Sequence, residues 1–181
     1  MPTLYAQLLG PRWSSLAPPV QRIHAGVGVA RGVFVVRRGV GVLARPIGAV
    51  LGMPPAADAT PITLEVECAG GVERWKRDFD GRPLLTTQWA DGGLLVENLG
   101  GVQCWFRLRV EDGGLIFEQV RTTIGLRRFA VPLPRFLSPR VVGRAEARER
   151  SAHAQVDVRI HAPLVGLLVS YEGAVTPDEA G

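Results

Sequence analysis

Three side chains in the second half of the chain combine a titratable group with a place in or beside a predicted strand: His161, Glu118 and Tyr171. His161 precedes Ala162-Pro163 at a strand end, where the mouth of a barrel presents reactive groups. Glu118 lies between bulky apolar residues, and a carboxylate buried in such surroundings has a raised pKa. If the protein is an enzyme, these three residues are its predicted acid–base groups, in an isomerase, cyclase or lyase reaction.

The same side chains have a second interpretation, in which they belong to solvated strand faces. Successive strand residues face opposite sides of a sheet, so Glu118 either enters a cavity or points outward. His153, Asp157 and His161 share one strand face, but four strand residues span roughly 13 Å, too far for one metal ion or one proton. We therefore predict no metal site.

The sequence carries no motif of a common enzyme class. It lacks the Gly-x-Ser-x-Gly, Ser-x-x-Lys, His-Glu-x-x-His and Walker patterns, which leaves hydrolase, protease and nucleotide-hydrolysing functions without support. Gly26, Gly28 and Gly32 do not form a phosphate loop, because valine-rich strand sequence follows them instead of a helix. No cofactor is predicted.

Aromatic side chains are spread over several predicted strands, so closure of the sheet would bring some of them inside. An aromatic lining suits a flat or polycyclic apolar ligand, whereas the alternative is a core packed solid with side chains. The predicted ligand contacts combine aromatic residues with arginines and apolar residues near a proline-rich loop. They are Trp89, Phe106, Phe117, Arg128, Leu133, Arg135 and Phe136.

The basic residues concentrate in one region. Residues 121–150 hold eight arginines and two glutamates, a local balance of +6 against +4 for the whole chain. This region either attracts an anionic head group or a membrane surface, or is a solvated strand face in which Glu146 pairs with Arg144 or Arg148. No nucleic-acid-binding motif accompanies the charge, so nucleic acid is not a predicted partner.

A proline-rich segment, residues 131–140, interrupts this basic region. Its three prolines exclude a central strand, yet Leu133, Phe136 and Leu137 are apolar. The segment is predicted to be a lid over a cavity, a surface element that contacts a membrane or a partner, or a plug in one barrel end. Membrane contact would be weak and superficial, because no apolar run is long enough to span a bilayer.

From residue 62 onward, apolar and polar residues alternate between glycine-centred turns, which is typical of antiparallel hairpins. A wide twisted sheet must close or be covered to protect its edges and apolar face. The predicted fold is mainly β (α+β): a strongly curved antiparallel meander closing into a barrel or cone of roughly ten strands, with two or three short helices from the N-terminal third packed on it. Predicted helices lie near residues 4–9, 16–23 and 43–51, and predicted strands at 27–37, 62–68, 73–79, 84–90, 94–99, 102–110, 115–123, 141–150, 153–161 and 165–175.

The chain's 181 residues, 46% of them hydrophobic, suffice for one domain with a sizeable core. We predict a single domain over 1–181, with a lid region of helices and first strand at 1–55 and the β meander at 60–177. The first residues lack the features of a secretion signal, which predicts a cytoplasmic protein. In that compartment Cys68 and Cys104, both on the apolar-facing register, are predicted to be buried, reduced thiols.

Motifs spread over almost the whole chain carry a family resemblance. They include Leu4-Tyr5-x-x-Leu8-Leu9-Gly10, Glu73-Arg74-Trp75, Val131-Pro132-Leu133-Pro134-Arg135 and Gly166-x-Leu168-Val169-x-Tyr171-x-Gly173. In these motifs the chain resembles the bacterial DUF4166 family, a domain of unknown function. Members of that family sometimes follow a saccharopine-dehydrogenase-like domain, so the resemblance implies a reductase-type metabolic partner. It implies no catalytic residue.

Two functional hypotheses follow. The leading hypothesis is a β-barrel domain that binds a small apolar or anionic-headed molecule and is accessory to a metabolic pathway. The alternative is an acid–base enzyme that works in the same cavity. Both require a barrel with a hollow interior.

Overall fold

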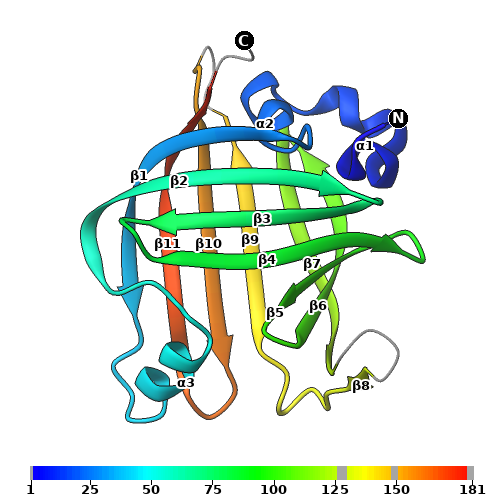
Figure 1. The fold of residues 1–181 in the computed structure, drawn as a ribbon. Coiled ribbons are helices and arrows are strands. Elements are labelled where there is room, and N and C mark those ends of the chain that lie inside the picture. The colour runs from blue at the N-terminus through cyan, green and yellow to red at the C-terminus, as the bar shows by residue number, and fades with distance from the viewer. Residues whose placement is uncertain (1, 126–129, 148–150, 179–181) are drawn as a thin grey trace.

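The computed structural model describes residues 2–125, 130–147 and 151–178, and within these ranges ten antiparallel strands close into a barrel that carries one further short strand. The strands are β1 (Gly28–Arg38), β2 (Ala57–Ala69), β3 (Val72–Phe79), β4 (Pro83–Asp91), β5 (Leu94–Leu99), β6 (Val102–Glu111), β7 (Gly114–Ile124), β8 (Val131–Pro132), β9 (Arg140–Glu146), β10 (Ala154–Ala162) and β11 (Gly166–Pro177). Strands β1 to β7 pair in chain order, β9 pairs with β7, and β11 returns to β1, which closes the barrel (Figure 1). The predicted fold is thereby confirmed.

Tight glycine turns produce this meander. Gly70 and Gly71 join β2 to β3 with φ values of 59° and 76°, and Gly92 and Gly93 join β4 to β5 with φ values of 57° and 76°. Two successive positive φ values are typical of the type I′ turn, whose twist matches that of the flanking strands. Glycine adopts these angles without the steric penalty of a Cβ atom, so the turn residues help to fix each hairpin register.

Side chains alternate between the interior and the outer surface along each strand. On β3, Glu73 and Trp75 are buried, whereas Arg74 between them is exposed. The same period of two residues places Leu84 and Thr86 inside on β4. One continuous core therefore runs around the inner wall of the barrel.

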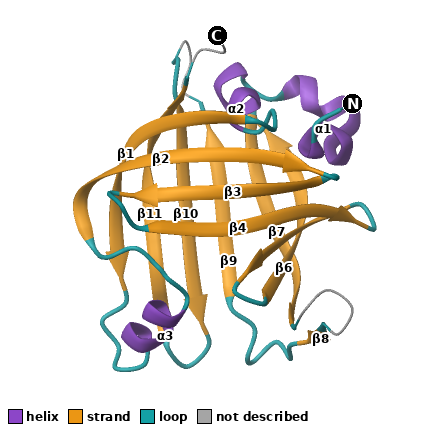
Figure 2. Ribbon diagram, viewed as in Figure 1, coloured by secondary structure: helices purple, strands orange, loops and turns teal. Residues whose placement is uncertain are grey.

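Short helices cover the two ends of the barrel (Figure 2). At one end lie α1 (Leu4–Leu9), the 3-10 helix η1 (Gly10–Ser15) and α2 (Pro18–Ile23), and at the other lies α3 (Ala44–Val50). Helices this short are not stable alone in water, so their apolar faces hold them in place: Tyr5 and Val20 have no exposed surface. None of the helices within the described residues has the length and apolar character that a membrane crossing needs.

One sequence prediction is wrong in part, and one of the three alternatives for the proline-rich segment is excluded. Cys104 is buried, but Cys68 is exposed, because it lies among the last residues of β2, where the strand runs out to its turn with β3. The segment 131–140 does not plug the barrel: Phe136 is 69% exposed and Leu137 is 52% exposed. Its prolines keep it outside the sheet, apart from the two-residue strand β8, and it lies on the surface.

Candidate functional site

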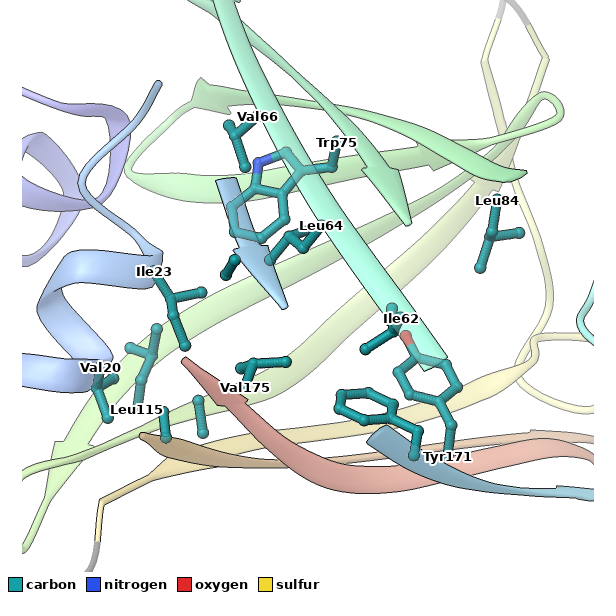
Figure 3. Close-up of a cluster of buried hydrophobic side chains, with 14 of the residues drawn as sticks. Val20, Ile23, Ile62, Leu64, Val66, Trp75, Leu84, Leu115, Tyr171 and Val175 are labelled. Atoms are coloured by element: carbon teal, nitrogen blue, oxygen red, sulfur yellow. The ribbon is translucent and has the colours of Figure 1, made fainter. Parts of the chain in front are cut away.

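The interior of the barrel contains a cavity lined by residues from all ten barrel strands and from α1 and α2. The cavity has about 730 Å³ of space free of protein atoms, including its opening, and about 90 Å³ of it is accessible to the centre of a water molecule. This is room for several waters or for part of a small organic molecule. Figure 3 shows apolar side chains of helices and strands pointing toward one another here, among them Ile23, Leu64, Trp75, Tyr171 and Val175.

A charged pair lies in this mostly apolar wall. Arg77 of β3 donates from Nη2 to Oε1 of Glu97 on β5 at 3.1 Å, and from Nη1 to the hydroxyl oxygen of Thr86 on β4 at 2.8 Å. The Thr86 hydroxyl in turn donates to Oε1 of Glu97 at 2.8 Å. The side chains of Arg77 and Glu97 are only 14% and 21% exposed. Three adjacent strands thus form one closed polar triangle, of which Arg77 and Glu97 line the cavity.

The surroundings keep Arg77 charged and the nearby phenols neutral. Burial lowers the pKa of Arg77, but the Glu97 carboxylate offsets this effect, so that the pKa lies above its ordinary value. Burial raises the pKa of Tyr171 and of Tyr5. The guanidinium carbon of Arg77 also lies 5.2 Å from the centre of the Trp75 ring, in reach of a cation–π contact.

Aromatic residues close the helical end of the cavity. Tyr5 and His24 meet edge to face with ring centres 4.6 Å apart, and Trp75 lies 5.6 Å from His24. The Tyr5 hydroxyl donates to Oε1 of Gln88 at 2.7 Å. His24 donates from Nδ1 to the Val20 carbonyl at 2.9 Å, and burial lowers its pKa to about 4, so the ring is neutral at physiological pH. His24 is therefore a buried, neutral histidine that donates to the backbone of α2.

Glu73 attaches the first helix to the barrel wall. Its Oε2 accepts a hydrogen bond from the Trp75 indole N–H at 2.9 Å, and the Leu4 backbone amide at the start of α1 is near enough to the carboxylate to favour its charged form. Burial raises the pKa of Glu73, and its Oε1 has no hydrogen-bond partner among the described residues. These contacts hold the helical cap over the cavity.

Three of the predicted site residues line the cavity: Phe106, Phe117 and Tyr171. Phe117 lies across Gly143 of the neighbouring strand β9, where an added Cβ atom would come within 3.4 Å of the Phe117 ring. The absence of a side chain at Gly143 makes room for the ring. Tyr171 stacks on Phe34 with ring centres 5.8 Å apart.

The other two predicted acid–base residues point away from the cavity. Glu118 is on the outer face of β7, with Oε2 3.9 Å from Nη1 of Arg107, and His161 is exposed on β10. The reason is strand alternation: Phe117 and Ile160 are oriented inward, so their neighbours Glu118 and His161 are oriented outward. The structure does not bring His161, Glu118 and Tyr171 together.

The remaining predicted ligand contacts also lie outside the cavity or beyond the described residues. Trp89 is on the outer face of β4, opposite Val96 of β5. Leu133, Arg135 and Phe136 belong to the surface segment after β8. Arg128 lies outside the described residues.

A side chain replaces part of the backbone ladder where β7 and β9 separate. These strands pair only from Leu115 to Phe117 of β7, and beyond that point the Gln119 side chain bridges the gap. Its Oε1 accepts from the Val141 backbone N–H at 2.6 Å, and its Nε2 donates to the Pro139 carbonyl at 2.8 Å. Val141 itself lines the cavity. Among the described residues, this seam has fewer paired residues than any other junction between neighbouring barrel strands.

The polar centre of the site was not among the residues predicted from the sequence. Glu73, Trp75, Arg77 and Phe79 occupy alternate positions, so an arginine shares one strand face with two large aromatic residues. That pattern was the available signal for Arg77. Its partner Glu97 was recognisable only as a carboxylate in apolar sequence that either enters a cavity or points outward.

The comparison with protein families decides the relationship. The model of a domain of unknown function, DUF4166, matches residues 16–175. The chain belongs to the DUF4166 family. No curated protein matches the sequence. Among solved structures, a protein with unknown function from the DUF3598 family of Nostoc punctiforme PCC 73102 is similar, with a TM-score of 0.50, 15% sequence identity and coverage of 89% of this chain.

This DUF4166 chain spans 50% of the length of that DUF3598 protein. At 15% identity the likeness concerns the fold alone. Chemistry must therefore be argued from the cavity. Within the described residues no cluster of His, Cys, Asp and Glu has the arrangement of a metal site.

Proposed function

We propose that this protein binds a small, largely apolar molecule inside the barrel. The observation that carries the proposal is a cavity whose wall is mostly apolar and aromatic, with the Arg77–Glu97 pair as its charged centre. The other polar residues of the lining are His24, Gln88 and Arg144. Ligand pockets typically combine such a wall with a few fixed polar groups that orient the ligand. In a core that only packs side chains, burial of an arginine and a glutamate would be unfavourable, because each buried ion loses its hydration.

The charge balance of the cavity favours a neutral ligand over an anionic one. Arg77 already has Glu97 as its counter-ion, so a ligand carboxylate would add an uncompensated negative charge in a poorly hydrated space. The guanidinium has five N–H donors. One donates to Thr86 and one donates to Glu97. A ligand carbonyl or hydroxyl oxygen could accept from a remaining donor.

An accessory metabolic role is part of the same proposal. A carrier or sensor of a small apolar molecule needs no catalytic group, and His161 and Glu118 face away from the cavity. The cytoplasmic location that we expect from the sequence agrees with two unlinked cysteines, one of them on the surface. The reductase-type partner is what the family resemblance implies.

Ligand occupancy can be measured directly. Native mass spectrometry of the purified protein is expected to give a mass above that of the chain, which organic denaturation returns to the chain mass. For a protein that has lost its ligand, titration with the neutral fluorophore 1-aminoanthracene is expected to show saturable binding. A chain that has only its own mass and binds no probe would refute the proposal.

A cavity-filling variant with a matched control makes the test specific. Val158→Trp places an indole in the cavity, whereas Val142→Trp adds the same indole on the outer face of the adjacent strand, where Val142 is 48% exposed. We expect Val158→Trp to lower probe affinity at least tenfold and Val142→Trp to leave it unchanged. Equal affinities in two folded variants would contradict binding inside the barrel.

A further inference from the structure

Three separate connections lie at the barrel end opposite α1 and α2 (Figure 1), and each of them exposes an apolar side chain. Val42, in the connection between β1 and α3, is 90% exposed. Leu164, in the turn between β10 and β11, is 97% exposed, and Phe136, in the segment after β8, is 69% exposed. Large apolar side chains exposed together mark a site of interaction.

The three connections adjoin one another and form a single surface, here called the end face (residues 39–56, 131–140 and 162–166). An added Cβ atom on Gly41 would lie 3.4 Å from the Val165 carbonyl oxygen, so the first connection contacts the β10–β11 turn. Arg140, at the start of β9, lies opposite His161 of β10 in the strand pairing, and His161 is next to that turn. The exposed apolar residues therefore lie around one end of the barrel.

The charged residues of the end face are all basic. Its three segments contain Arg45, Arg135 and Arg140 and no aspartate or glutamate. An open groove beside α3 is lined by Arg45 together with Arg38 and Arg82. Arg38 donates to the carbonyls of Met53 and Pro54, whereas no ion pair is found for Arg45 or Arg82 among the described residues.

Leu164 has an unusual backbone for a large apolar residue. Its φ of 62° lies in the left-handed region, which is unfavourable for leucine, and its side chain is not buried in return. In the isolated chain this leucine gains nothing from packing. Insertion into an apolar phase would give the exposed side chain a favourable environment.

We propose that the end face docks on an anionic phospholipid bilayer. The exposed apolar residues lie at several separate tips, a geometry suited to insertion between lipid head groups rather than to one groove for a partner. Arginines without acidic neighbours attract the negative surface of such a membrane, and apolar tips add shallow insertion. This proposal does not depend on what the cavity binds.

Vesicle flotation tests the docking. The full chain is mixed with vesicles of phosphatidylcholine alone or of phosphatidylcholine with phosphatidylglycerol. We expect flotation with the anionic vesicles, at least fivefold less with the neutral ones, and release by high salt, because salt screens exposed charges. Absence of flotation, or equal flotation with both vesicle types, would overturn the proposal.

Variants assign the binding to the end face. Leu164→Asn removes the apolar side chain and tolerates the left-handed backbone, so it does not threaten folding. Two double variants are tested: Leu164→Asn with Phe136→Ser, and Arg135→Glu with Arg140→Glu. Each is expected to reduce flotation at least fivefold. The controls Val27→Asp and Arg12→Glu change an exposed valine and an exposed arginine near the helical end and should float like the wild type.

Two results would point to a different use of the end face. If the control variants lose flotation as strongly as the end-face variants, nonspecific charge explains the binding and the proposal fails. If analytical ultracentrifugation shows a dimer that the end-face variants abolish while the wild type does not float, the face pairs two copies of the chain and the proposal fails as well.

Discussion

Arg77 and Glu97 stand on strands β3 and β5, separated by the whole width of β4, and their side chains meet at 3.1 Å inside the barrel. Thr86 of the intervening strand contacts both. This pair is the only ion pair among the described residues in which both side chains are less than one-quarter exposed; the others lie on the surface. The polar centre of the cavity therefore depends on the register of three consecutive strands.

Removal of one member of this pair should destabilise the fold. Glu97→Leu leaves the Arg77 guanidinium buried without its counter-ion, and such a loss typically costs about 3 kcal/mol. Urea unfolding followed by tryptophan fluorescence measures the change. The double variant Arg77→Met with Glu97→Leu should regain most of the loss, and Glu65→Gln, which breaks the exposed pair with Lys76, should unfold like the wild type. A Glu97→Leu protein as stable as the wild type would contradict a buried pair.

The lowered pKa of His24 implies that the folded protein loses stability in mild acid. Its pKa is about 4 in the folded chain and 6.5 in the unfolded one, so the unfolded state binds the extra proton first as pH falls. The stability from the neutral ring is complete above about pH 6.5 and decreases toward pH 4, by about 3 kcal/mol in all. Urea unfolding at several pH values measures this slope, and His24→Leu should flatten it. An unchanged slope in that variant would show that other groups cause the acid sensitivity.

The two cysteines should differ in reactivity. Burial raises the pKa of the Cys104 thiol to about 12, whereas Cys68 is exposed at the barrel rim. Since the thiolate is the reactive form, iodoacetamide at pH 8 should modify Cys68 and leave Cys104 intact. Mass spectrometry after proteolysis identifies the modified residue. In urea both should react, and rapid labelling of Cys104 without denaturant would mean that the barrel opens readily.

Gln119 should control opening of the seam between β7 and β9. Gln119→Leu removes the acceptor for the Val141 N–H and the donor to the Pro139 carbonyl, each bond contributing about 1 kcal/mol. Hydrogen exchange at the Val141 amide should accelerate roughly fivefold or more, as expected for a local opening made easier by about 1 kcal/mol. Gln103→Leu, at the buried bond to Thr123 on the outer face, serves as the control and should leave Val141 unaffected.

Much of the architecture was predictable from local sequence. Paired glycines mark the hairpin turns, and the two-residue period identifies the strands between them, because each follows from the conformation of a few adjacent residues. The family also was recognisable from short motifs such as Glu73-Arg74-Trp75. Phe106 and Phe117 were predicted at the site because large aromatic residues on a strand usually find the interior.

Only the tertiary structure decided which side of the wall is the inside. Phe117 and Glu118 are neighbours on one strand, so they cannot both reach the cavity, and the sequence alone allows either orientation. Closure of the barrel selects the register that packs Phe117 against Gly143 and leaves Glu118 on the outer face. Likewise Arg77 and Glu97 become partners only when β4 aligns them, because a contact across three strands is fixed by sheet pairing and not by separation along the chain.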